Sequence, residues 1–310
     1  MTLITEDKLP NLFIPGAGKS GTSSLHQFLN THPSISMSTI KEPHFWTNPN
    51  YDKYKLQDFE TYLSLFNPEI IYRGESSTGY LFFENFIENI QKRYSKSPKF
   101  IILLRNPIDR IYSHYCWLKG IGSENLELKK AILNNKNIVP DQLQQLPEHH
   151  YKNYFQFGLY GNRVDKFYKT FGKENIHIIT TEKLLSDKLN TVNSCFIFLG
   201  IKPLQTLPEN NLNQTTILKF PWLYKNVKKF ALGKYKIKKI AKPFFPKSIR
   251  KKLNGNIYPT IFKLTATSKK YPKATSAERT WIKQLYCQDI AILKKTTQMS
   301  FNEWKDFNDI

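Results

Sequence analysis

Residues 12–25 read LFIPGAGKSGTSSL, and this stretch decides the fold that we expect. Three apolar residues predict a short buried strand, a glycine-rich turn follows, and apolar residues spaced three and four apart from Leu25 predict a helix. A helix that begins directly after such a turn presents free backbone N–H groups and the positive end of its dipole. Lys19 adds a full positive charge, so the stretch predicts a site for an anion.

The turn also supplies hydroxyl donors. The candidate anion-binding residues are Gly18, Lys19, Ser20, Gly21, Thr22, Ser23 and Ser24. A nucleoside triphosphate loop of the form G-x-x-x-x-G-K-[ST] matches only at its end, because Phe13 stands where its first glycine belongs. An ordinary helix preceded by a Gly/Ser turn also fits the stretch, since such turns are common.

Composition sets bounds on the class of protein. The chain has 310 residues, a formal net charge of +21 and 40% hydrophobic residues, which predicts a globular chain with one large α/β domain or two small ones. The positive excess predicts an anionic partner, such as a phosphate, an acidic sugar, nucleic acid or a membrane surface. The 3 cysteines are far apart in sequence, which favours neither a disulfide framework nor a metal site.

The sequence has neither the pattern of a signal peptide at its start nor a run approaching the ~18 apolar residues of a membrane helix. We therefore expect a cytoplasmic protein. Residues 219–252 contain no Asp or Glu and interleave aromatic residues with lysines. They predict a basic surface that contacts a glycan or, peripherally, the inner surface of a membrane. A lysine-rich helix pair with its aromatic residues in a core fits this segment equally well.

A second candidate site follows the apolar run KFIILL at residues 99–104, which predicts a central parallel strand. Arg105 ends this run, and Pro107 begins a helix that carries Ser113. Because a guanidinium matches the geometry of a phosphate, Arg105 and Ser113 predict a phosphate site. An arginine in an ion pair at the edge of the core fits the same pattern.

A third candidate site is the segment Lys41-Glu42-Pro43-His44. Glu42 and His44 alternate, so they would share one side of an extended segment. A carboxylate beside an imidazole suits a general base. A surface glutamate beside a half-buried histidine also explains the pattern.

These motifs occur in an order that resembles the sulfotransferase family. The chain has K-x-G-T-[ST]-x-L from Lys19, KEPHF at 41–45, GES at 74–76, RNPxDRxYSHY from Arg105, a G-x-Y signal ending at Tyr160, and a late basic turn at 269–272. Within the family, the sequence is similar to the carbohydrate branch that includes heparan sulfate 3-O- and N-sulfotransferases. The resemblance covers most of residues 10–200 and returns at 269–304.

The resemblance implies an α/β fold of the P-loop-like sulfotransferase type, with a mostly parallel central sheet flanked by helices. It implies a single domain over residues 1–310, in which residues 120–150 and 205–260 build the acceptor side. The implied reaction moves a sulfuryl group from 3′-phosphoadenosine 5′-phosphosulfate (PAPS) to a hydroxyl or amine of a carbohydrate or glycolipid by in-line displacement. The implied product is 3′,5′-adenosine bisphosphate, and no metal is expected.

The resemblance also implies roles for individual residues. The loop 18–24 would wrap the 5′-phosphosulfate with Lys19 on its bridging oxygen, and Arg105 and Ser113 would hold the 3′-phosphate. The implied general base is Glu42, with His44 as its partner, and we expect a partly dry site to raise the pKa of Glu42. Lys269, Lys270 and Tyr271 would close over the nucleotide, and Lys41, Ser76 and Tyr160 would contact the acceptor.

One departure from the family concerns Ser76, because the family segment usually reads GEKS with a lysine near the reaction centre. Either another group such as Lys41 serves as the base, or the acceptor differs from a typical heparan unit. Two other classes of protein stay open: a P-loop kinase of small molecules, and a polyanion-binding protein without chemistry. We do not expect nucleic acid as the partner.

Overall fold

The computed structural model describes residues 6–47, 59–137, 152–209, 217–218, 266–267, 271 and 273–310. The chain divides into two compact units. The first comprises Met1–Ile111, Asn135–Asn213 and Ala274–Ile310, and the second comprises Tyr112–Asn134 and Gln214–Lys273.

The first unit is built on a five-stranded sheet in the order β2-β3-β1-β4-β5, and every pair of neighbouring strands is parallel. The strands are β1 (Leu12–Ile14), β2 (Ile35–Met37), β3 (Tyr72–Ser76), β4 (Lys99–Leu104) and β5 (Ile176–Thr180). Helices flank this sheet, so the predicted α/β fold with a parallel central sheet is confirmed. The apolar run at 99–104 forms the predicted buried strand β4.

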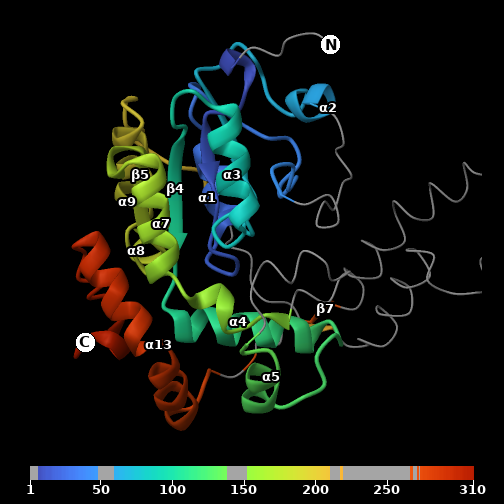
Figure 1. Ribbon diagram of the computed structural model, residues 1–310, viewed down its shortest axis with the longest axis vertical. Coiled ribbons are helices and arrows are strands. Elements are labelled where there is room, and N and C mark those ends of the chain that lie inside the picture. The colour runs from blue at the N-terminus through green and yellow to red at the C-terminus, as the bar shows by residue number, and fades with distance from the viewer. Residues whose placement is uncertain are drawn as a thin grey trace, which may run out of the picture. The chain divides into compact units, whose positions relative to one another are not determined.

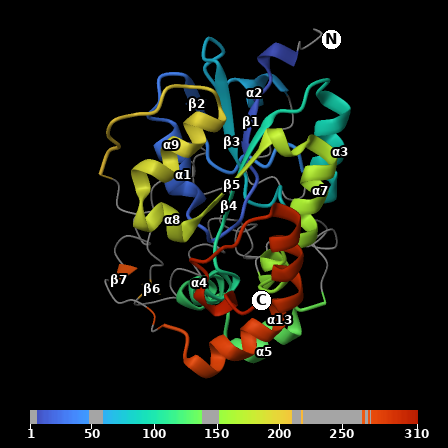
Figure 2. The same cartoon turned by 90° about the vertical axis from the view of Figure 1, so that its left-hand side faces the viewer.

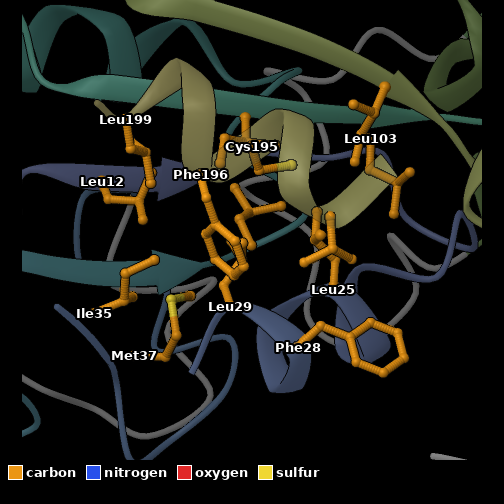
Figure 3. Packing of buried hydrophobic residues seen from close by; sticks show 14 of the residues in the cluster. Leu12, Leu25, Phe28, Leu29, Ile35, Met37, Leu103, Cys195, Phe196 and Leu199 are labelled. Atoms are coloured by element: carbon orange, nitrogen blue, oxygen red, sulfur yellow. The ribbon is translucent and has the colours of Figure 1, made fainter. Parts of the chain in front are cut away.

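Helices cover both faces of the sheet (Figures 1 and 2). One face carries α1 (Thr22–Leu29), α8 (Thr181–Ser186) and α9 (Lys188–Phe198), and the other carries α3 (Glu84–Arg93) and α7 (Gly161–Phe171). Successive side chains of a strand point to opposite faces, so β1 contributes to two cores. Leu12 and Ile14 join the aliphatic cluster under α1 and α9, which Figure 3 shows from close by. Phe13 faces the aromatic cluster on the other side, where its ring lies 5.7 Å from that of Phe86.

The connections place the carboxyl ends of β1 and β4 side by side. The chain leaves β1 through α1 on one face, whereas the connections from β3 to β4 and from β4 to β5 pass through α3 and α7 on the other. Neighbouring strands whose connections run to opposite faces form a switch point, where ligands bind in open α/β sheets. The loops after β1 and β4 are the two that carry Lys19 and Arg105.

Helix α13 (Ser276–Thr297) packs along α7 and stabilises its start. Thr275 and Glu278 form a capping box at the beginning of α13. Further along, the carboxylate of Asp289 accepts hydrogen bonds from the backbone N–H groups of Tyr160 (2.6 Å) and Gly161 (3.0 Å). A Cβ at Gly161 would lie 2.6 Å from the carbonyl oxygen of Asp289, so this close approach requires glycine. Asp289 thus supplies the N-terminal acceptor that α7 needs.

The C-terminal segment attaches to the start of α4 (Pro107–Gly120), a helix that begins in the first unit and ends in the second. The carboxylate of Asp306 pairs with Arg279 and accepts a hydrogen bond from Asn106 Nδ2 at 2.8 Å. Glu182 accepts from the backbone N–H of Asn106 at 3.0 Å and from Trp304 Nε1 at 2.9 Å. These contacts hold the residue that follows Arg105.

Short elements complete the description. The first unit also contains η1 (Glu6–Lys8), α2 (Phe59–Leu63), η4 (Gln156–Gly158), η5 (Lys173–Asn175) and η7 (Lys305–Phe307). The second contains α5 (Leu128–Asn134) and the antiparallel pair β6 (Ile217–Leu218) and β7 (Ala266–Thr267). Among the described helices, none combines the length and the apolar character that crossing a membrane demands.

Candidate functional site

The start of the loop between β1 and α1 is held by backbone hydrogen bonds. The backbone N–H of Ala17 donates to the carbonyl of Leu103 at 2.7 Å and that of Leu103 to Gly16 at 3.0 Å, which extends the pairing of β1 with β4. The N–H of Leu81 donates to the carbonyl of Pro15 at 2.9 Å. The start of the loop is therefore anchored to the end of β4 and to the turn that follows β3.

Two features of this loop suit an anion. Gly21 precedes α1 in a left-handed conformation (φ 91°), and no side chain caps the helix, so its first N–H groups have no side-chain acceptor at that position. The hydroxyl of Ser20 is buried and makes no hydrogen bond within the part of the chain that the structure describes. A buried donor without an acceptor is costly. A bound anionic group at this loop would supply the acceptor.

The structure brings Arg105 to this loop. Its Nη1 donates to the carbonyl of Lys19 at 3.0 Å. Thr181 is the first residue of α8. Its hydroxyl is a hydrogen-bond donor within reach of two carbonyl oxygens, that of Ser20 at 2.7 Å and that of Leu104 at 3.0 Å. The two predicted nucleotide-binding strand ends are thus tied together. Thr181 was not predicted from the sequence, in which its only signal is its place after an apolar strand.

Glu42 and His44 lie in a loop that is not extended. Both adopt left-handed backbone conformations (φ 58° and 54°), as does Lys19 (φ 70°). Among the described residues, only five that are not glycine have positive φ, and three of them are the predicted catalytic ones. Such conformations are uncommon in non-glycine residues and concentrate at functional sites.

Hydrogen bonds to the end of β3 hold this loop. The N–H of Glu42 donates to the carbonyl of Ser76 at 3.0 Å, and the N–H of His44 donates to Ser77 Oγ at 3.1 Å. The carboxylate of Glu42 faces Lys41 Nζ at 2.7 Å through Oε1 and His44 Nε2 at 3.7 Å through Oε2. The predicted base and its predicted partner are therefore neighbours.

The pKa of Glu42 differs from the expectation. Burial acts to raise this pKa, but the ammonium of Lys41 and the imidazole of His44 outweigh it and hold the pKa well below its ordinary value. The predicted raised pKa is wrong, because that reasoning counted desolvation alone and did not include the ion pair with the preceding residue.

Thr78 links the carboxylate to the anion-binding loop. Its hydroxyl lies 3.3 Å from Glu42 Oε1, to which it donates. The same hydroxyl would lie 3.6 Å from a Cβ built at Gly18. Glu42 therefore borders the loop that carries Lys19, which is the placement that a general base for a group bound there requires.

A buried carboxylate supports the loop from behind. Glu75 is fully buried, and its carboxylate accepts hydrogen bonds from Ser77 Oγ at 2.5 Å and from the hydroxyl of Tyr62. Burial raises the pKa of Glu75 to about 7, although its hydrogen bonds act to lower it. Ser77 also accepts from the N–H of His44, so Glu75 helps to position that residue. This role of Glu75 was not predicted from the sequence, in which Glu75 is part of the GES motif at 74–76.

Ser76 and Tyr160, both expected to contact the acceptor, have their hydroxyls engaged inside the protein. Ser76 is fully buried, and its Oγ lies 2.6 Å from Nδ1 of His26. Burial, together with the charge of Lys41, lowers the pKa of His26 to about 4. Tyr160 is fully buried and donates to the carbonyl of Arg105 at 3.1 Å. Their acceptor contacts stay predictions.

Other predicted residues are not joined to this site by what the structure describes. Ser113 lies on α4, in the part of that helix that belongs to the second unit. Tyr271 also belongs to the second unit and is half-buried. Lys269 and Lys270 lie outside the described residues. The segment 219–252 and most of the expected acceptor-side regions also lie outside them. Across the described ranges, no three His, Cys, Asp or Glu side chains gather in a way that would hold a metal ion.

Comparisons with known proteins agree on one family. A family model described as a sulfotransferase domain matches residues 9–255. Carbohydrate sulfotransferase 15 of Mus musculus is 26% identical over 266 residues, covering 65% of this chain and 45% of that protein. The human bifunctional heparan sulfate N-deacetylase/N-sulfotransferase 2 is 26% identical over 243 residues, covering 70% of this chain and 24% of that protein. The chain thus spans less than half the length of these relatives.

The fold is also known. The crystal structure of a sulfotransferase from Alicyclobacillus acidocaldarius superposes with a TM-score of 0.67 at 22% identity, covering 96% of this chain and 99% of that one. At this level of identity the likeness is one of fold.

Proposed function

The chain belongs to the sulfotransferase family, and we propose that it transfers a sulfuryl group from PAPS to a hydroxyl or amine of a carbohydrate or glycolipid. The observation that carries this proposal is the position of Glu42. Its carboxylate borders, through Thr78, the loop whose uncapped helix start and buried Ser20 hydroxyl suit an anion. A carboxylate beside an anion site can take the proton of the group that receives the sulfuryl group, and it is not needed to bind the anion.

In PAPS, the sulfuryl group is joined to the 5′-phosphate through a bridging oxygen. The loop of residues 18–24 would hold its 5′ end through the first N–H groups of α1 and the hydroxyls of that turn. Lys19 would lie against the bridging oxygen. Arg105, whose guanidinium already contacts this loop, would hold the 3′-phosphate from the end of β4.

Glu42 would take the proton of the acceptor's hydroxyl or amine while the oxygen or nitrogen of that group attacks the sulfur atom. In that displacement, a bond from the acceptor to sulfur forms while the bond from sulfur to the bridging oxygen breaks. The bridging oxygen leaves with the electron pair as part of 3′,5′-adenosine bisphosphate. Lys19 and the loop N–H groups would stabilise the charge that grows on it, which is the main task of a protein in such transfers.

The acceptor class rests on the relatives and on charge. The matched relatives are named for carbohydrates and heparan sulfate, and the chain carries a net charge of +21, which suits an anionic glycan. The residues that would select one acceptor over another are not assigned. A cytoplasmic location and membrane contact through residues 219–252 stay predictions.

The test is transfer of labelled sulfate from PAPS to a panel of glycosaminoglycans and glycolipids, with ATP as an alternative donor. We expect transfer from PAPS alone, and a loss of about 10²- to 10⁴-fold in kcat for Glu42→Gln with bisphosphate binding retained. The exposed Glu69→Gln serves as the control, and its activity should be unchanged. Phosphoryl transfer from ATP, or full activity of Glu42→Gln, would contradict the proposal.

A further inference from the structure

The ion pair between Lys41 and Glu42 raises a chemical problem for the proposed reaction. Lys41 Nζ lies 2.7 Å from Glu42 Oε1, and the two side chains are 25% and 34% exposed. An ammonium at this distance stabilises the ionised carboxylate and weakens it as a proton acceptor. A carboxylate held in this way becomes a stronger proton acceptor once its partner has moved away.

Further polar groups lie around the pair. His44 faces the other carboxylate oxygen at 3.7 Å, and Thr78 faces Oε1 at 3.3 Å from the turn after β3. His26, on α1, lies near enough to Lys41 for the ammonium to lower the pKa of its imidazole. Lys41 and His44 are the ionisable groups that lower the pKa of Glu42 most strongly.

An anion bound at the loop of residues 18–24 would be a second partner for the ammonium of Lys41. The hydroxyl of Thr78 donates to Glu42 Oε1 and would lie 3.6 Å from a Cβ built at Gly18. The ion pair of Lys41 and Glu42 therefore lies beside the loop. A phosphosulfate bound there carries more than one negative charge. It would compete with the single charge of Glu42 for the same ammonium, because the Coulomb attraction grows with the charge of the partner.

We propose that Lys41 exchanges partners during the reaction: it pairs with Glu42 in the free protein and turns to the phosphosulfate when the donor binds, which frees Glu42 to take the acceptor proton. This inference rests on the proposed function. Lys41 then contacts the donor directly and acts on the proton transfer through Glu42. The exchange also accounts for an ammonium near the reaction centre of a chain in which Ser76, hydrogen-bonded to His26, stands where the family usually has lysine.

The experiment is an NMR titration of the Glu42 carboxyl carbon in protein labelled with ¹³C-glutamate, with the signal assigned from Glu42→Gln. It is run on the wild type, Lys41→Met and Lys41→Arg, each free and with 3′,5′-adenosine bisphosphate. We expect Lys41→Met to raise the pKa of Glu42 in the free protein and Lys41→Arg to keep it low. We expect the bisphosphate to raise this pKa in the wild type and to change it less in Lys41→Met.

Two further readouts accompany the titration. Bisphosphate affinity should fall about tenfold in Lys41→Met, as for the loss of one charge-assisted contact, and should stay unchanged in the exposed control Lys92→Met. The acid limb of the pH profile of kcat/KM should move to higher pH in Lys41→Met, which a merely structural role would not produce.

The outcomes separate the two proposals. A Glu42 pKa that is the same in Lys41→Met and the wild type overturns the exchange, as does a wild-type pKa that bound bisphosphate leaves unchanged. Failure of the wild type to bind the bisphosphate at all overturns the donor assignment, and the exchange with it.

Discussion

Replacing Glu75 by Gln tests the buried network behind the loop of Glu42 and His44. The carboxyl of Glu75 is fully buried, and burial raises its pKa from 4.5 to about 7. Between these two pH values the folded protein keeps a proton that the unfolded chain has released. The free energy of unfolding contributed by Glu75 therefore falls as pH rises through this window.

The magnitude follows from the separation of the two pKa values. A difference of one pH unit corresponds to 1.36 kcal/mol, so the shift to about 7 corresponds to a loss of about 3 kcal/mol across the window. Glutamine does not titrate, so Glu75→Gln lacks this term. The substitution also changes the unfolding free energy by a constant amount, because it places an amide where two hydroxyls donate hydrogen bonds. This amount does not depend on the titration of residue 75.

The assay is urea denaturation of the wild type and Glu75→Gln at several pH values from 5 to 8.5. All other titrating groups are shared, so they cancel in the difference between the two unfolding free energies. We expect the stability of the wild type relative to the variant to fall by about 3 kcal/mol from the acid to the alkaline end. The exposed Glu69→Gln, treated in the same way, should show a difference that does not vary with pH.

A difference between wild type and Glu75→Gln that stays constant with pH would refute the reasoning, because it would mean that Glu75 is ionised at every pH tested. A difference that grows with pH would refute it more strongly, since the hydrogen bonds from Ser77 and Tyr62 would then stabilise the ionised carboxylate by more than burial destabilises it.

Three further predictions concern the residues that shape the donor site. Thr181→Val should weaken binding of the bisphosphate about tenfold by calorimetry, because the carbonyls of the loop and of β4 lose their shared donor, whereas Thr181→Ser should bind as the wild type does; equal losses in both variants would contradict this role. Gly21→Ala should cost about 1 kcal/mol or more in unfolding free energy, because φ is 91° at this position, and unchanged stability would show that the loop relaxes. Asp289→Ala should cost about 1–2 kcal/mol by removing the acceptor at the start of α7, with Asp289→Asn closer to the wild type, and an equal loss in both would point to packing instead.

The parts of the fold that depend on local pattern could be predicted from the sequence. The strand, turn and helix at 12–29 follow from the apolar spacing, and the run at 99–104 has the continuous apolar character of a strand buried on both faces. The approach of Arg105 to the loop of Lys19 also follows, because the carboxyl ends of parallel strands lie at one edge of a sheet.

The rest of the site depends on contacts between residues far apart in the sequence. Thr78 meets Gly18 only because the turn after β3 packs against the loop after β1, and no local pattern indicates that pairing. Asp289 reaches α7 across more than a hundred residues. The lowered pKa of Glu42 was missed for a different reason, since Lys41 is adjacent in sequence but its direction depends on a left-handed backbone at Glu42 that the sequence did not indicate.

The measurement that tests the central claim most directly is calorimetric binding of 3′,5′-adenosine bisphosphate, with ATP as the control ligand, to the wild type and to Lys19→Ala. We expect tight binding of the bisphosphate, weak binding of ATP, and loss of bisphosphate binding in the variant. Binding of ATP as tight as that of the bisphosphate, or no binding of the bisphosphate to the wild type, would contradict the assignment of PAPS as the donor.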